Sequence, residues 1–204
     1  MQDIEVIKIL KEELKFTDQS IEKLKIFEME LLKANKKHNF IANSTENHIW
    51  FRHILDSAQI VKYIDFRHGS LLDLGSGAGF PGLILALNSE GQDFHVKLAE
   101  KSLVKRRFLR DMADKLNIEV SIIGNIYNEE ISADIIVCRA FKKLEVIMKI
   151  SREILKKSHK IIILKGKDAQ AEINNLPMDK NCRYKLASSI TDRKSKIVLV
   201  DVKK

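Results

Sequence analysis

Cysteine, proline and aromatic residues are scarce in this sequence, and each shortage excludes a class of protein. Two cysteines occur among 204 residues, Cys138 and Cys182, and they stand in no paired-ligand spacing. A disulfide-stabilised secreted scaffold and a cysteine-based zinc site are therefore excluded, and a reducing compartment, the cytoplasm, is expected. With two prolines and eight glycines, the chain has no proline-rich linker and no low-complexity tract.

Long hydrophobic runs and metal-ligand clusters are also missing. No apolar run approaches the ~18 residues of a membrane span, and Met1-Gln2-Asp3 does not begin a signal peptide. None of the six histidines shares a metal-ligand spacing with another histidine or a cysteine, so we expect no metal and no membrane association. The residues that are present, 45% hydrophobic and 31% charged, are typical of one folded globular domain.

Positive charge is in excess, and it is confined to one part of the chain. The formal net charge is +8, yet residues 1–70 carry eleven basic and eleven acidic side chains and so sum to zero. The rest of the chain supplies the whole excess. A basic surface attracts polyanions, nucleic acid above all, although a lysine-rich protein without such a partner would have the same composition.

Hydrophobic periodicity changes character from residue 70 onward. Residues 2–37 have apolar side chains at helical spacing in two stretches, with Thr17 as the N-cap between them, and residues 45–64 predict a third helix. Beyond residue 70, short β-branched runs alternate with helical stretches at 81–88, 102–117, 142–157 and 167–175. The predicted strands are Leu71–Leu74, Phe94–Ala99, Val120–Ile123, Ile135–Cys138, Ile161–Leu164, Leu186–Ile190 and Ile197–Val202.

This alternation predicts a Rossmann-like α/β fold, with a mostly parallel, doubly wound sheet and helices on both faces. The last two runs have no helix between them, so we expect them to form an antiparallel C-terminal pair. The chain should then be one compact unit, with a helical cap over residues 1–66 packed on a core domain over residues 67–204.

A glycine-rich segment follows the first predicted strand, where an open α/β sheet binds its ligand. It reads Asp73-Leu74-Gly75-Ser76-Gly77-Ala78-Gly79-Phe80-Pro81-Gly82. Glycines at alternate positions allow a tight turn and a close backbone approach to a ligand, and Pro81 suits the first turn of a helix. The embedded G-x-G-x-x-G leaves NAD open. Asp73, two residues before Gly75, and a chain too short for a second substrate domain favour a methyl donor, and a turn without a ligand is the plain alternative.

Glu100 ends the second predicted strand. An acid at this position typically accepts hydrogen bonds from ribose hydroxyls, which NAD and S-adenosylmethionine share, so it does not discriminate between them. The alternative is a surface acid paired with Lys101 or Lys105.

Six segments together resemble the glucose-inhibited division protein B family, bacterial methyltransferases that make N7-methylguanosine in 16S ribosomal RNA. They are Lys36-Lys37-His38-Asn39-Phe40, Arg52-His53-Ile54-Leu55-Asp56-Ser57, the loop from Asp73 to Gly82, Arg107-Phe108-Leu109, Cys138-Arg139-Ala140-Phe141 and Leu164-Lys165-Gly166. The resemblance covers nearly the whole chain, and the R-H-x-L-D-S block together with the G-x-G-F-P-G ending makes it specific. It implies a class I methyltransferase fold, S-adenosylmethionine as cofactor with S-adenosylhomocysteine as product, and 16S ribosomal RNA or a small ribosomal subunit as partner.

The resemblance also implies cofactor contacts at particular positions. Those positions, together with the loop and strand-end candidates, are Asp73, Gly75, Gly77, Gly79, Phe80, Glu100, Ile126, Tyr127 and Arg139. The chain departs from the family twice, with Asn125-Ile126-Tyr127 in place of Arg-Ala-Glu and Asn39-Phe40-Ile41 in place of Asn-Leu-Thr. Backbone contacts at the first departure would be preserved, whereas loss of a carboxylate that bound the adenine amino group would weaken affinity.

Methylation of guanine N7 needs no general base, because N7 has a lone pair and no proton at neutral pH. We therefore expect catalysis by positioning, without a catalytic dyad, with Arg139 and Lys165 as contributors. Cys138 does not follow a proline, so it is interpreted as a buried strand residue rather than as the nucleophile of cytosine methylation. The Asp/Asn-Pro-Pro-aromatic turn of adenine methylation is absent too. Arg139 is expected to neutralise the cofactor carboxylate or a substrate phosphate, with a structural pair to Asp73 or Glu100 as the alternative.

Basic side chains at strand ends and on one helix are the candidates for binding RNA. They are Arg106, Arg107, Arg110, Lys142, Lys143, Lys165, Lys167, Arg193, Lys194 and Lys196, and the helix residues could equally be a solvated face. Phe80 or Phe141 could stack an unpaired guanine, but core packing is the preferred interpretation of both. His53 is expected to bond to the backbone or to Asp56 rather than to carry protons.

The leading hypothesis is thus a monomeric enzyme that methylates N7 of a guanine in 16S ribosomal RNA. A methyltransferase of another RNA or a protein, an NAD-linked oxidoreductase and a non-catalytic RNA-binding protein remain open alternatives.

Overall fold

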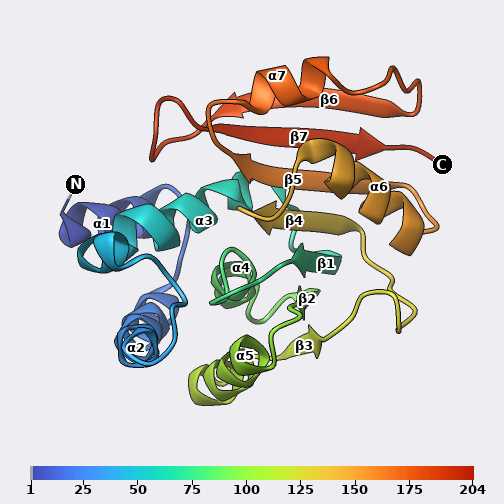
Figure 1. Cartoon of the computed structure of the whole chain (residues 1–204). Helices are drawn as coiled ribbons and strands as arrows, with labels where there is room; N and C mark the ends of the chain where they lie inside the picture. Colours follow the sequence, from blue (N-terminus) through green and yellow to red (C-terminus); the bar gives the residue numbers. More distant parts are fainter. Residues whose placement is uncertain (1) are drawn as a thin grey trace.

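The chain forms one seven-stranded sheet with helices on both faces (Figure 1). The structure is a computed structural model, and it describes residues 2–204. The strand order is β3-β2-β1-β4-β5-β7-β6, with β1 to β5 parallel and β7 antiparallel to both of its neighbours. This confirms the predicted doubly wound sheet and its antiparallel end. The strands are β1 His68–Leu74, β2 Asp93–Ala99, β3 Val120–Ile123, β4 Ile135–Arg139, β5 His159–Lys165, β6 Cys182–Ser188 and β7 Lys196–Val202.

One strand differs from its prediction. The run at Leu186–Ile190 predicts a strand there, whereas β6 spans Cys182–Ser188 and the chain turns at residues 189–195. Ile190 is 44% exposed, and its backbone N–H donates to the side chain of Gln59 instead of to a strand. The apolar character of Ile190 therefore led the sequence pattern to predict a strand where the chain forms a turn.

Helices precede the sheet and lie between its strands as predicted, with slightly shorter ends. They are α1 Asp3–Glu12, α2 Asp18–Asn35, α4 Gly82–Asn88, α5 Leu103–Leu116, α6 Leu144–Ile154 and α7 Ala169–Asn174. Thr17 caps α2, since its side chain accepts the N–H of Ser20 at 3.0 Å. Two hydrophobic clusters lie on the two faces of the sheet, one shared with α2, α4 and α5 and the other with α6 and α7.

The third predicted helix is helical over its length but irregular. It consists of a 3₁₀ segment η1 (Asn43–His48), a π-helical segment η2 (Trp50–Leu55), a short α-helix α3 (Asp56–Ala58) and a second 3₁₀ segment η3 (Gln59–Tyr63). π-Helical turns are rare and often lie at functional sites. Here the irregular segment carries His53 and Asp56 to the carboxyl edge of the parallel strands, where both contact the end of β4.

The N-terminal helices share a hydrophobic core with the sheet. Phe27 on α2 is fully buried, and its ring centroid lies 5.4 Å from that of Phe80 and 6.4 Å from that of Phe108. Val6 and Leu10 of α1 belong to the same cluster. Within residues 2–204, no helix combines the length and the apolar character needed to cross a membrane.

Candidate active site

The glycine-rich loop leaves β1 at the carboxyl edge of the sheet, and its glycines are required by its geometry. Gly75 has φ +77°, and a Cβ there would lie 2.5 Å from Cδ2 of Phe141. Gly82, at the start of α4, has no room either, because a Cβ would lie 2.2 Å from Cδ2 of Leu98. A Cβ at Gly77 would meet nothing closer than 3.8 Å, so the backbone there is open to a ligand. The loop therefore fits the close backbone approach that a nucleotide-like cofactor requires.

The buried side chain of Asp73 stabilises this loop. Its side chain is fully buried, and Oδ2 accepts the N–H of Gly82 at 2.9 Å, which ties the end of β1 to the start of α4. Burial raises the pKa of Asp73 to about 7. The carboxylate thus lies beneath the loop surface, and its direct contact with a cofactor stays a prediction.

Asp73→Asn is expected to remove part of the pH dependence of stability. The pKa of Asp73 is 3.8 when exposed and about 7 in the folded chain, so the folded state keeps a proton that the unfolded state releases. The raised pKa therefore makes the wild type lose stability relative to the variant as the pH rises from about 4 to about 7. Urea unfolding across this range measures the difference, with Asp201→Asn on the exposed end of β7 as the control. If the difference in unfolding free energy between the wild type and Asp73→Asn does not change with pH, the raised pKa of Asp73 is contradicted.

Glu100 follows β2 and also holds the loop. Its Oε2 accepts the N–H of Gly77 at 3.0 Å, and its Oε1 accepts the N–H of Ser102 at 2.8 Å. In the described part of the chain it forms no ion pair with Lys101 or Lys105, so the alternative of a lysine-paired surface acid is wrong. The carboxylate is oriented by two backbone donors at the loop, and each oxygen keeps acceptor capacity for a ribose hydroxyl.

The side chains of three other cofactor candidates are buried in the core or hydrogen-bonded to another side chain. Phe80 is 5% exposed and packs in the core against Phe27 and His53, which confirms the preferred packing interpretation. Ile126 is buried among the side chains on the α6 face, and the hydroxyl of Tyr127 donates to Glu153 at 3.0 Å. Any cofactor contact at these three positions would come from the backbone, and it stays a prediction.

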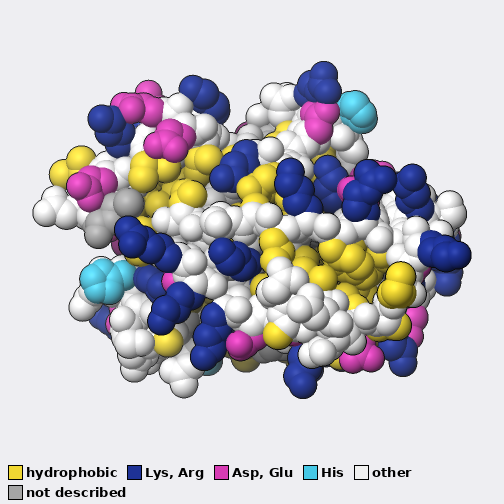
Figure 2. Space-filling view, turned by 90° about the horizontal axis from the view of Figure 1, so that it is seen from above, with side chains coloured by type: hydrophobic (Ala, Val, Ile, Leu, Met, Phe, Trp, Pro, Cys, Tyr) yellow, Lys and Arg dark blue, Asp and Glu magenta, His cyan; other side chains and the backbone are white. Residues whose placement is uncertain are grey.

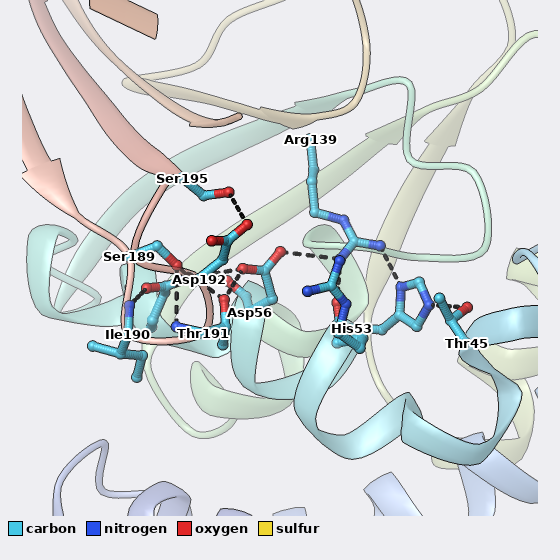
Figure 3. A network of polar contacts seen from close by, with 11 residues as sticks. Thr45, His53, Asp56, Arg139, Ser189, Ile190, Thr191, Asp192 and Ser195 are labelled. Atoms are coloured by element: carbon cyan, nitrogen blue, oxygen red, sulfur yellow. Dashed lines mark hydrogen bonds and ion pairs between the residues drawn. The ribbon is translucent and has the colours of Figure 1, made fainter. Parts of the chain in front are cut away.

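Arg139, the last residue of β4, is held by the irregular helical segment (Figure 3). Its Nη1 donates to the carbonyl oxygen of Arg52 at 3.0 Å and to Oδ2 of Asp56 at 3.2 Å, and its Nη2 lies 2.6 Å from Nδ1 of His53. The alternative of a structural pair with Asp73 or Glu100 is therefore wrong, while the expected contact of Arg139 with the cofactor carboxylate or a substrate phosphate stays a prediction. Sequence order could not reveal the true partners, because Asp56 and Arg139 are 83 positions apart.

The protonation state of His53 follows from these contacts. Arginine only donates hydrogen bonds, so Nδ1 of His53 must accept, and Nε2 must carry the proton that it donates to Oγ1 of Thr45, 2.8 Å away. Burial and the neighbouring Arg139 and Arg52 charges lower the pKa of His53 to about 3. The expectation that His53 bonds to the backbone or to Asp56 is wrong. It is a neutral acceptor whose bonds to Arg139 and Thr45 occupy both ring nitrogens.

Asp56 connects this arginine to the turn between β6 and β7 (Figure 3). Its Oδ1 accepts the hydroxyl of Thr191 at 2.6 Å and the side-chain amide of Gln59 at 2.9 Å. Gln59 in turn accepts the N–H of Ile190 at 2.9 Å and donates to Ser189 at 3.2 Å. The R-H-x-L-D-S block thus joins β4 to the turn at residues 189–195. Gln59 and Thr191 carried no sequence signal for this role.

A cleft of about 530 Å³ opens between these elements at the carboxyl edge of the sheet. Phe141 lines it and also lies against Gly75, so the cleft and the glycine-rich loop are adjacent. Ala140 between Arg139 and Phe141 has φ +49°, a conformation that is strained for a residue other than glycine and that is enriched at functional sites. The other lining residues come from η1, η2, α3, the segment after β4, β5, the β6–β7 turn and the start of β7, and they include Thr45, Arg52, His53, Asp56, Lys142, Lys143, Lys165, Ser189, Thr191, Asp192, Ser195 and Lys196.

The RNA-binding candidates differ in how exposed they are and in whether another side chain already pairs with them. Lys142 and Lys143 are exposed at the cleft, while Lys165 is paired with Glu172 at 2.7 Å and is not a free cation. Arg106 is half-buried with its guanidinium against Gly124, so it does not belong to a solvated face. The remaining exposed candidates are Arg107, Arg110, Lys167, Arg193 and Lys194. Lys and Arg side chains are spread over the face that carries β6 and β7 (Figure 2).

Cys138 is unsuited to nucleophilic chemistry. It is fully buried in β4, as predicted, and burial, together with the Asp73 charge, raises the pKa of its thiol. Among residues 2–204, no group of three or more His, Cys, Asp or Glu side chains has the arrangement of a metal site.

Comparison with known proteins matches the chain to one family over most of its length. The family model described as GidB, rRNA small subunit methyltransferase G, matches residues 20–198. The chain is 38% identical over 181 residues to ribosomal RNA small subunit methyltransferase G of Rickettsia felis, a match that covers 88% of this chain and 92% of the relative. The corresponding protein of Rickettsia bellii is 37% identical over 179 residues, with 87% and 91% covered.

Solved structures share the fold at low sequence identity. Cofactor-bound Rv0187 from MTB superposes with a TM-score of 0.66 at 13% identity, over 100% of this chain and 99% of that one. An MtNAS variant in complex with S-adenosylmethionine gives a TM-score of 0.60 at 14% identity, over 100% and 85%. Together these matches confirm the class I methyltransferase fold.

Proposed function

The chain belongs to the GidB family of rRNA small subunit methyltransferases, enzymes that take their methyl group from S-adenosylmethionine, and we propose N7 of a guanine in 16S ribosomal RNA as its acceptor. The supporting observation is that, among the described residues of the cleft, no free general base lies next to the glycine-rich loop, because the unpaired carboxylate of Asp192 belongs to the β6–β7 turn on the far side. His53 and Asp56, the groups best suited to that role, are both bonded to Arg139. N7 has a lone pair and no proton, so this acceptor needs no base.

The residues of the loop fit the methyl donor. The open backbone at Gly77 and the Glu100 carboxylate would hold the cofactor, whose sulfonium supplies an electrophilic methyl group. The protein then has to orient N7 in line with the methyl–sulfur bond, which is catalysis by positioning. The cleft lies on the β4 side of the loop, and its mouth carries Lys142 and Lys143 for the RNA backbone.

Glu100→Ala is expected to weaken S-adenosylmethionine binding by about tenfold to a hundredfold, the range of a hydrogen bond to a charged group. The side chain would be lost both as a ribose acceptor and as the acceptor of the Gly77 N–H, whereas Glu100→Gln would keep part of each role. Isothermal titration calorimetry with S-adenosylhomocysteine measures the change. Glu119→Ala, on an exposed turn before β3, is the control. Wild-type affinity in Glu100→Ala would contradict the placement of the cofactor.

The proposed function is tested with the purified protein, S-adenosylmethionine, and 16S ribosomal RNA or small subunits. Nucleoside mass spectrometry should detect N7-methylguanosine, and S-adenosylhomocysteine should raise the melting temperature because it binds only the folded state. A melting temperature raised by NADH but not by S-adenosylhomocysteine would support an oxidoreductase instead. Methylation of RNA at another atom would keep the enzyme class and refute the N7 assignment. A monomeric state and a cytoplasmic location stay predictions.

A further inference from the structure

We propose that Asp192, in the turn between β6 and β7, selects guanine by accepting hydrogen bonds from its N1–H and exocyclic amino group. This inference rests on the proposed function, because it requires N7 to face the methyl donor. Asp192 lines the cleft together with Thr191 and Ser195, on the side away from the glycine-rich loop.

The order of the strands sets the direction of the base. From the loop after β1, the sheet continues through β4 and β5 to β7, and neighbouring strands are about 4.8 Å apart. The methyl donor lies at the β1 end, so a guanine in the cleft lies over β4 and β5 with N7 toward β1. Its opposite edge, which carries N1–H and the amino group, then faces the β6–β7 turn.

The carboxylate of Asp192 is oriented to accept hydrogen bonds from that edge of guanine. Its Oδ2 accepts the hydroxyl of Ser195 (Figure 3) and its Oδ1 accepts the N–H of Lys194, both at 2.9 Å. These bonds, with the nearby Arg52 and Lys194 charges, lower the pKa of Asp192, so the side chain is ionised at neutral pH. A carboxylate has about four acceptor positions, so each oxygen can accept one further hydrogen bond. Two adjacent donors on guanine match two oxygens fixed by the turn.

The other carboxylate that lines the cleft, that of Asp56, already has an ion-pair partner and hydrogen-bond donors. Asp56 is paired with Arg139 and also accepts from Thr191 and Gln59. Asp192 has no ion-pair partner within 4.0 Å among the described residues. The same placement disfavours adenine, because adenine presents an acceptor at N1, which a carboxylate repels, where guanine presents a donor.

Inosine lacks the amino group but keeps N7 and N1–H, so it isolates the proposed contact. Small-subunit RNA is transcribed with a small fraction of ITP in place of GTP and methylated as free RNA or in reconstituted subunits. Mass spectrometry then compares N7-methylinosine with N7-methylguanosine, corrected for the inosine incorporated. The wild type should prefer guanine by about tenfold or more, as expected when a charged acceptor loses its donor.

In Asp192→Asn the preference for guanine should fall to within about threefold, because an amide cannot offer two acceptor oxygens. Asp192→Ala, which removes both oxygens, should give the same loss, and Asp201→Asn should keep the wild-type preference. A structural defect alone would slow both products equally and leave their ratio unchanged. An unchanged ratio in Asp192→Asn and Asp192→Ala, with N7-methylguanosine still formed, would overturn the proposal alone. Absence of N7-methylguanosine with the wild type would instead overturn the proposed function.

Discussion

Arg139→Ala is expected to lower kcat/KM for small-subunit RNA by about a hundredfold to a thousandfold, while the protein still folds. Truncating one partner of a hydrogen-bonded, desolvated charge pair costs about 2–5 kcal/mol, and here the pair shapes the cleft. The loss would leave Asp56 and His53 without the guanidinium that joins them and would free the end of β4 from the irregular helical segment. Steady-state methyl transfer with varied RNA and varied S-adenosylmethionine measures the effect on each substrate.

Two further variants show whether geometry or charge is responsible. Arg139→Lys keeps the charge but cannot contact the Arg52 carbonyl, Asp56 and His53 together, so it should recover little of the activity. Arg67→Ala, at an exposed position just before β1 and outside the set of RNA-binding candidates, is the matched arginine control. Activity of Arg139→Ala within about threefold of the wild type, less than 1 kcal/mol, would show that the arrangement around Arg139 is not needed for the reaction.

Phe27→Ala is expected to destabilise the whole chain by about 3–5 kcal/mol, the cost of removing a large aromatic ring from a packed core. The ring is fully buried and lies against Phe80, in the glycine-rich loop, and Phe108, on α5. For a chain of this size the melting temperature should fall by about 6–20 °C. Because one core joins the N-terminal helices to the sheet, unfolding should remain a single transition.

Calorimetry or urea unfolding monitored by two probes measures both quantities. Met29→Ala on the same helix is the control, since Met29 is 53% exposed. Two separate transitions, with only the first shifted by Phe27→Ala, would show instead that residues 1–66 form an independent unit.

The sheet could be predicted from the sequence because its signals are local. Runs such as Ile161–Leu164 are buried on both faces and therefore read as continuous apolar segments rich in β-branched residues. The N-cap at Thr17 is equally local, since its acceptor and its donor are three residues apart. The cofactor loop was recognisable because its backbone geometry restricts several positions to glycine.

The partners within the site could not be predicted, because they depend on contacts between distant segments. His53 and Arg139 are 86 positions apart, and Asp56 and Thr191 are 135 apart. The irregular winding of residues 43–63, which directs His53 and Asp56 toward β4, has no signature in hydrophobic periodicity. The burial of Arg106 escaped prediction for a related reason. Its position on α5 suggested solvent, but the absence of a side chain at Gly124 gives its guanidinium a place to pack.

Methyl transfer to guanine N7 in small-subunit RNA can be measured directly in cells with and without the gene. Small-subunit ribosomal RNA is purified from both strains, digested to nucleosides and analysed by mass spectrometry. Our expectation is that N7-methylguanosine falls by one residue per RNA when the gene is removed and returns when the wild-type gene, but not Arg139→Ala, is restored. An unchanged N7-methylguanosine content in the small-subunit RNA would contradict it.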